Sequence, residues 1–588
     1  MPRSIACLTL GLLVACAGCR GAEEKPAGGN ADARFQAIAD RLIADTLKRN
    51  PTTATMLGIH DYDNALEDVS RLAVDAEVTA LKQFRTELSA IDPTTLSSSN
   101  QLDLAQAISA VDSQMLERQI VRGWTKNPDL YSTAITQTAF VMINRNFAAP
   151  EVRLRELVQR ERLMPGNLGE ARKNLENPPQ IYTDIAIEQL DGDIGFFKSS
   201  VPAAFTSVTD QALLDQFKQA NQGVIDALTA YKTWLQSDLK PRSKGSYVLG
   251  PEALAAKFRV NEMVSVGLPR LQAIAEADLA KNDAEFQKIA AQIAPGRPTR
   301  EALTQVSLEH PPADKLLSTT QGQLDALRQF IADRHLLTIP NAPPAQVIET
   351  PPFMRAMTTA SMDTPGPFET KATEAYYRVT LPDPAWRPAQ AESYLRAWYL
   401  PEIVNVSVHE VYPGHYTQFL YGPSFPSKIR KVFGANSNAE GWAHYCEQMM
   451  LDEGLANGDP KYRLAQLQDA LLRDVRFIVG IQLHTGKITV EQAEKMFEEK
   501  GYQQPEVALA EAKRGTSDPT YGYYTLGKLM ILKLRDDYRA QQGAKFSLQD
   551  FHDRFLKLGP LPLPLVRKAM LGETGEVLPE KQEIANSK

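Results

Sequence analysis

Apolar residues recur at helical spacing along most of this chain, and this periodicity constrains the fold more than any other feature. Side chains three and four positions apart share one face of an α-helix, and an apolar face of this kind usually packs into a core. Three such stripes are Phe35, Ile38, Leu42 and Leu47; Phe217, Val224, Leu228, Tyr231 and Leu235; and Leu464, Leu467, Leu471, Val475 and Ile478. The sequence therefore predicts a mainly α-helical protein.

Proline and glycine mark where these helices are expected to end. Breaks are predicted at Asn50-Pro51, Pro165-Gly166, Pro178-Pro179, Pro241 and Pro295-Gly296. Prolines crowd between Ile339 and Pro388, and the helical period fades there. Within that stretch, residues 374–381 are rich in aromatic and β-branched side chains, which predicts a strand.

The length of the chain fits two lobes around a cleft. At 588 residues, of which 43% are hydrophobic, the chain exceeds one ordinary domain and can bury a large core. We expect a helical N-terminal lobe over residues 32–340. A second helical lobe, with the small β-structure, is expected over residues 341–588.

The N-terminus has the layout of a bacterial export signal. Residues 1–15 combine a short basic start with an apolar run that is too short to span a bilayer, and we expect them to be a signal peptide. The run ends in Leu13-Val14-Ala15-Cys16, which resembles a lipobox, so Cys16 is the predicted lipidation site and Cys19 the competing one. Residues 16–31 have little apolar content after the anchor, which predicts a lipidated start and a flexible linker.

These features predict an exported, periplasmic lipoprotein of a Gram-negative-type bacterium, held at the membrane by its lipid. The alternative is a cleaved signal followed by release into the periplasm. The net charge of −7 and the lack of a basic block at either end argue against a nucleic-acid partner. Beyond the leader and its junction, which contains Cys16 and Cys19, only Cys446 remains, so no disulfide framework is expected, and Cys446 is most simply a small buried residue.

A His-Glu pair followed closely by a second His is typical of a zinc hydrolase. The segment reads His409-Glu410-Val411-Tyr412-Pro413-Gly414-His415. Imidazoles can hold the ion, and a glutamate beside the first of them can take the proton of the attacking water. The six-residue spacing puts the two imidazoles on different faces of a regular helix. Because Pro413 and Gly414 can interrupt the helix, we expect a distorted turn that brings His415 back beside His409.

A second segment offers carboxylates for the same ion. Glu440, His444 and Glu447 are spaced four and three apart and share a helical face. Only one or two of them could reach an ion that the two imidazoles hold.

The two segments together closely resemble a bacterial family known as domain of unknown function 885. Its members carry HExxPGH followed by EGWAxYxE, and the chain shows both, at 409–415 and 440–447. The resemblance extends from Asn50-Pro51 to the segment that ends at Lys528. The family looks like a distant relative of the helical gluzincin peptidases, such as Taq-type carboxypeptidases and thimet-type oligopeptidases. This implies a large multi-helical, zincin-like fold with a small sheet near the active site and a central cleft.

The resemblance also implies roles for individual residues. It favours Glu440 as the third zinc ligand beside His409 and His415, and it allows Glu447 to orient a ligand imidazole. His444 stands at a variable position of the motif, so it is expected to be an additional polar group of the pocket or solvated. In a gluzincin-like site, the predicted strand would hold an extended peptide by main-chain pairing. A small structural hairpin that covers the core is the alternative.

The remaining candidates concern the reaction itself. Glu410 is predicted to be the general base, and its alternative is a surface carboxylate. A peptidase also needs a donor where negative charge develops on the carbonyl oxygen. His484, Tyr523 and Tyr524 are candidates for that donor, and Arg514 could hold a peptide carboxylate as a fork. Each of these four residues could equally be structural.

We therefore expect a zinc-dependent metallopeptidase that hydrolyses peptide bonds in an interlobe cleft. One alternative is a non-catalytic, peptide-binding lipoprotein, and another is a zinc amidohydrolase that acts on a non-peptide amide. Cobalt and manganese stay open as competitors of zinc, because metal availability decides much of this selection.

Overall fold

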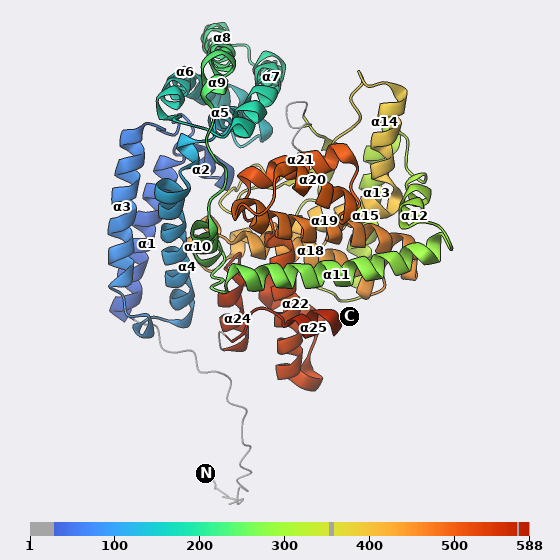
Figure 1. The fold of residues 1–588 in the computed structure, drawn as a ribbon. Helices are drawn as coiled ribbons and strands as arrows, with labels where there is room; N and C mark the ends of the chain where they lie inside the picture. The colour runs from blue at the N-terminus through green and yellow to red at the C-terminus, as the bar shows by residue number, and fades with distance from the viewer. Residues whose placement is uncertain (1–28, 352–354, 356–357, 573–574, 587–588) are drawn as a thin grey trace, which may run out of the picture.

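The computed structural model describes residues 29–351, 355, 358–572 and 575–586, and these form many helices and one small sheet (Figure 1). The mainly α-helical prediction is confirmed. The predicted signal peptide and Cys16 lie outside the described residues. Helix α1 begins at Gly29, so residues 29–31, expected to belong to the linker, are helical. In the part of the chain that the structure describes, no helix is long and apolar enough to cross a membrane.

The first half of the chain packs into two helical groups. The first comprises α1 (Gly29–Arg49), α2 (Pro51–Leu57), α3 (Arg71–Ser89) and α4 (Ser98–Leu116). Its core contains all four residues of the first predicted stripe, from Phe35 to Leu47. The second lies above it in Figure 1 and comprises α5 (Asp129–Asn144), α6 (Pro150–Asn174), α7 (Gln180–Ala203), α8 (Gln211–Trp234) and α9 (Lys240–Arg242).

The largest core joins the middle of the chain to its C-terminal half. The middle helices are α10 (Pro251–Asn261), α11 (Leu268–Ile293), α12 (Thr299–Ser307) and α13 (Leu316–Asp333). Leu254, Leu271 and Leu324 from these helices share one apolar cluster with C-terminal residues such as Ile403 and Tyr445. In Figure 1, α11 crosses the C-terminal half, where it packs along α19 (Pro460–His484). The core therefore does not change at residue 340, where the boundary between lobes was expected.

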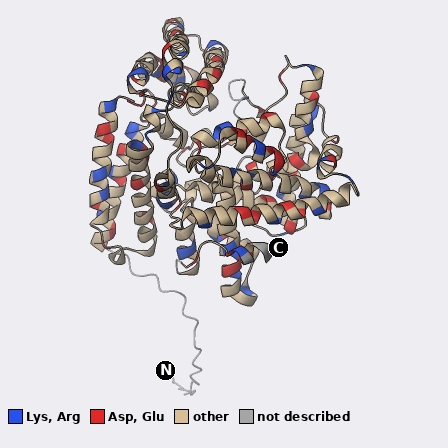
Figure 2. Ribbon diagram, in the orientation of Figure 1, with Lys and Arg blue, Asp and Glu red and all other residues tan. Residues whose placement is uncertain are grey.

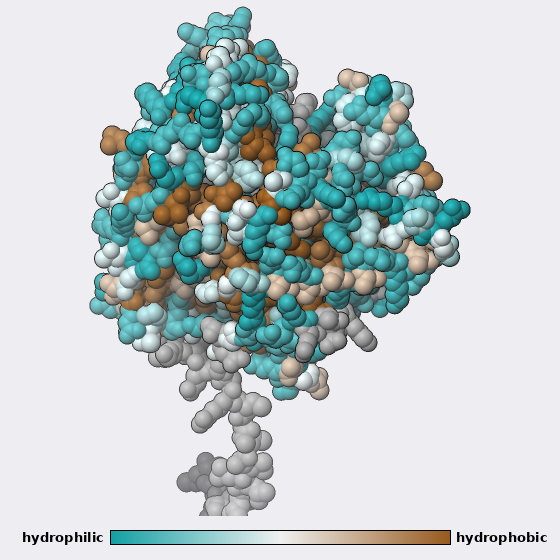
Figure 3. Space-filling view, viewed as in Figure 1, coloured by the Kyte–Doolittle hydropathy of each residue, from teal (hydrophilic) through white to brown (hydrophobic). Residues whose placement is uncertain are grey.

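The remaining helices belong to the C-terminal half, and three of them carry the residues of the site described below. They are α14 (Pro388–Leu395), α15 (Leu400–Glu410), α16 (His415–Leu420), α17 (Lys428–Val432), α18 (Asn436–Asp452), α19 (Pro460–His484), α20 (Val490–Glu499), α21 (Pro505–Ser517), α22 (Tyr523–Gln542), α23 (Leu548–Lys557), α24 (Leu563–Leu571) and α25 (Lys581–Asn586). On the face shown in Figure 3, hydrophobic residues gather where the N-terminal helices meet the C-terminal half. Acidic and basic residues are intermixed along the outer helices (Figure 2).

The predicted strand is the central strand of a three-stranded sheet. It forms β3 (Tyr376–Val379), which pairs in parallel with β1 (Gln346–Glu349) and antiparallel with β2 (Ala360–Asp363). Tyr377 and Val379 are fully buried, as expected for aromatic and β-branched side chains in a strand. Since both edges of β3 are already paired, β3 itself has no free edge for an extended peptide. The two outer strands are β1 and β2, and β2 packs against α15.

One predicted helix break is wrong. Helix α6 runs through Pro165, although proline removes one backbone hydrogen bond. Met164 and Leu168, on either side of this proline, are buried in the core of the second helical group. Burial of a large apolar side chain contributes about 1.5–3 kcal/mol, so the packing of this face offsets the local preference. The breaks at Pro178-Pro179 and Pro295-Gly296 are confirmed, because both pairs lie between helices.

Helix α6 also buries a carboxyl group without a partner. Glu161 is fully buried, and neither of its side-chain oxygens has a hydrogen-bond partner among the described residues. Burial raises its pKa well above the usual value, so the folded state keeps this carboxyl protonated. In the unfolded chain the carboxyl ionises near pH 4.3. The stability that the protonated Glu161 carboxyl contributes is therefore fully present below that pH. Above it, the free energy of unfolding falls by about 1.4 kcal/mol per pH unit while the folded state keeps the proton.

We expect Glu161→Gln to remove this pH dependence. In urea unfolding at pH 5 and pH 8, the wild type should lose stability relative to the variant at the higher pH. The same substitution at the half-buried Glu156 of α6 is the matched control and should leave the pH profile unchanged. Parallel profiles for wild type and Glu161→Gln would show that the buried carboxyl does not titrate as described.

Candidate metal centre

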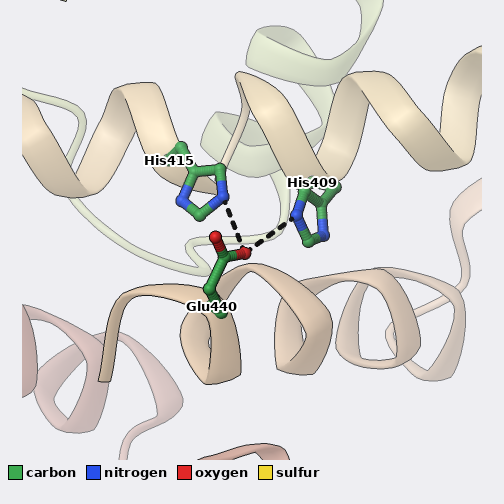
Figure 4. A group of neighbouring side chains, drawn as sticks. All are labelled: His409, His415 and Glu440. Atoms are coloured by element: carbon green, nitrogen blue, oxygen red, sulfur yellow. Dashed lines mark ion pairs between the residues drawn. The ribbon is translucent and has the colours of Figure 1, made fainter. Parts of the chain in front are cut away.

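Three side chains from three helices converge in the C-terminal half (Figure 4). His409 ends α15, His415 begins α16 and Glu440 lies in the first turns of α18. The Nε2 atoms of His409 and His415 lie 3.5 Å and 3.2 Å from Oε2 of Glu440. One ligand atom from each residue lies within 4.8 Å of the other two, which is a spacing that one metal ion can bridge. The structure thus brings together the three residues predicted as ligands.

The turn between the two histidines has the predicted interruption. Helix α15 ends at Glu410 and α16 begins at His415, with a cis peptide bond between Tyr412 and Pro413. Gly414 passes so close to the preceding helix that a Cβ atom there would lie 1.8 Å from the His409 carbonyl oxygen. The two imidazole rings end up 4.8 Å apart between centroids and nearly perpendicular. Only glycine fits at position 414, because its backbone alone fills the available space.

Glycine also sets the position of Glu440. At Gly441 a Cβ atom would lie 2.4 Å from the Gly527 Cα atom, and at Gly527 it would lie 1.9 Å from the Ser437 carbonyl oxygen. Helices α18 and α22 therefore cross in backbone contact. On the next residue, the Trp442 indole N–H donates to the Pro413 carbonyl at 2.9 Å. Helix α18 is thus fixed both to α22 and to the turn that carries His415.

Glu447 orients the first imidazole from behind. It is buried, and its Oε1 accepts from Nδ1 of His409 at 2.6 Å and pairs with Arg473 at 3.1 Å. Because Nδ1 of His409 carries this hydrogen bond, Nε2 is left with its lone pair toward Glu440. Burial alone would raise the pKa of Glu447, but the charge of Arg473 and the ring of His444 outweigh burial and hold it well below its usual range. The placement agrees with the role expected for Glu447.

His444 belongs to the same buried layer, so the expectation that it might be solvated is wrong. Its side chain is fully buried, and its Nδ1 donates to the second oxygen of Glu447 at 3.2 Å. Burial lowers the pKa of His444 to about 3, which keeps the ring neutral near pH 7. Sequence reasoning missed Arg473 in this layer. No sequence signal pointed to it, because position 473 lies on the face of α19 opposite the stripe that contains Leu471 and Val475.

The three convergent side chains fit a divalent metal. Two imidazole nitrogens and one carboxylate oxygen are a donor set that zinc takes in hydrolases. Oε2 of Glu440 is buried and has no hydrogen-bond partner among the described residues, although both Nε2 atoms are close. If both imidazoles are neutral, three lone pairs face one another, and a shared cation would stabilise this arrangement. Burial raises the pKa of Glu440, but His415 and His409 outweigh burial and hold it well below its usual range.

Glu410 lies directly after the first ligand, at the end of α15, and its side chain is half-buried. Burial, followed by the negative charge of Glu410, holds the pKa of the Tyr377 phenol above its usual range. The structure therefore brings β3 beside the predicted general base, as expected for a sheet near the site, although sequence reasoning did not single out Tyr377. Two strands of the sheet border the candidate centre, since β2 also packs against α15.

Three of the four remaining candidates gather on the His409 side. The Tyr524 ring stacks at 6.3 Å from the His409 ring and at 4.9 Å from the Tyr523 ring. Arg514 donates to the Tyr523 hydroxyl at 3.4 Å and pairs with Asp518 at 3.1 Å. Burial is the main cause that raises the pKa of Tyr524, with the charge of Glu440 adding to it, so the phenol keeps its proton.

The structure does not bring His484 to this group. Its ring is buried at the end of α19, Nε2 bonds to the Gly515 carbonyl at 2.8 Å, and its edge faces Tyr247. Among the described residues, it has no hydrogen bond or ion pair with His409, His415 or Glu440. The expectation that His484 donates to the oxyanion therefore has no geometric support.

We expect Glu447→Gln to weaken metal binding about 10- to 100-fold, because the uncharged amide holds the His409 imidazole less firmly. The measurement is a zinc titration against a competing chelator. Glu453→Gln, at the exposed end of the same helix, is the matched control and should bind zinc as the wild type does. Equal zinc affinity in wild type and Glu447→Gln would show that Glu447 does not orient the ligand.

The fold and the site together define a mainly α-helical protein with a buried His-His-Glu cluster. The chain belongs to the family described as "Bacterial protein of unknown function (DUF885)", which matches residues 51–570. The family suggested by the two motifs is therefore confirmed. No curated protein matches the chain.

Two solved structures share the fold over nearly the whole chain. One is described as "a putative lipoprotein of unknown function from Shewanella oneidensis", with 27% identity and a TM-score of 0.76 over 91% of this chain and 99% of that one. The other is described as "the putative lipoprotein from Colwellia psychrerythraea", with 19% identity and a TM-score of 0.76 over 92% of this chain and 99% of that one. Both descriptions agree with the lipoprotein of the alternative hypothesis, and neither mentions a peptidase.

Proposed function

We propose that this protein is a zinc-dependent metallopeptidase, distantly related to the gluzincin peptidases. The observation that carries the proposal is the convergence of His409, His415 and the otherwise unpartnered Glu440 oxygen on one point. These three residues would hold the ion. Bound zinc would supply a Lewis acid for the peptide carbonyl and would lower the pKa of a water.

The residues around this point have the chemistry that hydrolysis requires. The Glu410 carboxylate would take the proton of the attacking water and pass it to the leaving amine nitrogen. The Tyr524 hydroxyl, which burial keeps protonated, would donate to the carbonyl oxygen as negative charge builds on it. Tyr523 lies beside Tyr524 and is the second candidate for this donation.

The sheet supports a peptide as the substrate. The order β1-β3-β2 leaves one edge of β2 without a strand partner among the described residues. The backbone groups along such an edge can pair with an extended peptide. Because β2 packs against α15, a peptide bound along β2 would run close to His409 and Glu410.

The N-terminal signal supports export of this enzyme. We propose that Cys16 is lipidated and tethers the protein to a membrane facing the periplasm. The descriptions of the two solved neighbours as lipoproteins support this part of the proposal.

Metal analysis followed by a peptide-library digest tests the proposed activity. We expect about one zinc per chain, cleavage of peptides by the zinc-loaded protein, and loss of cleavage with a chelator that zinc restores. A protein that binds no divalent metal, or that holds zinc and cleaves no peptide in the library, would contradict the proposal.

The second candidate function is a peptide-binding lipoprotein without turnover. The lipoprotein descriptions of the two neighbours favour it directly. The same digest separates the two candidates, because a binding protein would retain library peptides and release them unchanged.

A further inference from the structure

The two sides of the candidate centre differ in chemistry. On the His415 side stands Phe419, one turn further along α16. Its ring lies parallel to the His415 ring, with 5.7 Å between centroids. The first four residues of α16 are buried, but Phe419 is 38% exposed. Single exposed apolar side chains are common, but this one stacks on a candidate metal ligand, where a substrate side chain would pass.

On the His409 side stand three arginines, and two of them are paired with carboxylates inside the protein. Arg473 pairs with both Glu447 and Asp469. Arg476 forms a two-point contact with Glu511 at 2.7 Å and 2.6 Å. Both guanidinium groups lie over the Tyr524 ring, so they hold the tyrosine in place. Their charges are already matched by the carboxylates of Glu447, Asp469 and Glu511.

Arg514 is the arginine that can still bind another carboxylate. Its ion pair with Asp518 and its contact with the Tyr523 hydroxyl both use the same nitrogen, Nη2. Its side chain is 37% exposed, and Asp518 is its one ion-pair partner among the described residues. A guanidinium can bind two carboxylate oxygens in parallel, so the rest of this fork can take a further carboxylate from solution.

We propose that this site selects peptides by two of their groups, one on each side of the candidate metal centre. An apolar, preferably aromatic side chain would pack on Phe419 beside His415, and a carboxylate of the peptide would bind Arg514 beside Tyr523. This inference rests on the proposed function in taking a peptide as the ligand. The carboxylate can be the C-terminal group of the peptide or an acidic side chain, since both present the same oxygen pair.

Peptide binding to zinc-loaded Glu410→Gln tests the inference, because hydrolysis is blocked in that protein. The probes are fluorescent six-residue peptides read by anisotropy. One parent peptide carries Phe, Glu and a free C-terminus, and three single changes give Phe to Ser, Glu to Gln and an amidated C-terminus. We expect the Phe to Ser change, and one of the two carboxylate changes, to weaken binding about tenfold or more. The carboxylate change that matters identifies which group Arg514 binds.

Second substitutions in the same protein assign the effects to residues. Phe419→Ala should bind the Phe and Ser peptides alike, with Phe419→Leu intermediate. Arg514→Gln should no longer distinguish the carboxylate peptide from its neutral counterpart, and Arg514→Lys should keep part of the difference. Leu163→Ala, an exposed apolar residue on α6, and the exposed Arg539→Gln on α22 are the matched controls. Zinc content and thermal unfolding identify variants that fail to fold.

The inference is overturned if no peptide binds saturably, or if both variants keep the peptide preferences of the parent protein. Its failure is distinguishable from failure of the proposed function. If the wild type cleaves no peptide but the binding preferences disappear in Phe419→Ala and Arg514→Gln, the peptide-selection site is supported and hydrolysis is contradicted. A wild type that cleaves peptides, with variants that keep every preference, would do the reverse.

Discussion

Glu410→Gln is expected to keep its zinc and to lose peptide hydrolysis by about a hundred- to ten-thousand-fold. Glutamine has the shape of glutamate but takes no proton, so the water and the leaving amine lose their acid-base partner. The residue is not one of the three convergent ligands, and zinc content should therefore be unchanged. The measurements are kcat/KM on a peptide found in the library digest and metal analysis of the same preparation.

Glu402→Gln is a matched control on the same helix. Burial, followed by the charge of Asp469, holds the pKa of Glu402 well above its usual range, which favours the neutral carboxyl. An amide in its place should leave both zinc content and turnover unchanged. Wild-type activity in Glu410→Gln would rule out the mechanism, and loss of zinc from that variant would instead assign Glu410 to metal binding.

Lys528→Met is expected to destabilise the protein by about 3–5 kcal/mol, because it leaves a buried charge without its partner. Lys528 of α22 donates to Asp278 of α11 at 2.7 Å, and both side chains are 2% exposed. Asn282 of α11 donates to Asp474 beside this pair at 2.7 Å. Burial, followed by the charge of Asp278, holds the pKa of Asp474 well above its usual range.

Urea unfolding measures this effect. Adding Asp278→Asn to Lys528→Met should restore part of the lost stability, because it removes the uncompensated carboxylate. Lys495→Met breaks a surface pair with Glu499 on α20 and is the control, with an expected loss of less than about 1 kcal/mol. A Lys528→Met protein as stable as the wild type would show that the buried pair does not hold α11 to α22.

The parts of the site that sequence could predict are those written within short segments. The interrupted turn follows from Pro413 and Gly414, and the convergence of His409 with His415 follows from that turn. Glu440 came from the resemblance rather than from spacing, because its helix begins after a separate short helix. The strand at 374–381 was predictable from its side chains, but its central place in the sheet depends on β1 and β2, which carry weaker signals.

The parts that sequence could not predict depend on contacts between distant segments. Arg473 reaches Glu447 only because α19 packs beside α15 and α18, and Tyr377 reaches Glu410 only because the sheet borders α15. Pro165 failed as a helix break because its neighbours are buried by other helices. His484 resembled a site residue through its nearness in sequence, but the length of α19 carries it to the Gly515 carbonyl instead.

The crossing of α18 and α22 at Gly441 and Gly527 has a consequence for how this protein can vary. Because the two backbones touch directly at these glycines, no side chain lies between the helices that could change its size or rotamer to accommodate a substitution. We expect substitutions in surface loops and outer helices to leave this contact unchanged. The contact therefore keeps Glu440 of α18 and Tyr524 of α22 at a constant separation. The main chain itself thus fixes the spacing of side chains around the candidate metal centre.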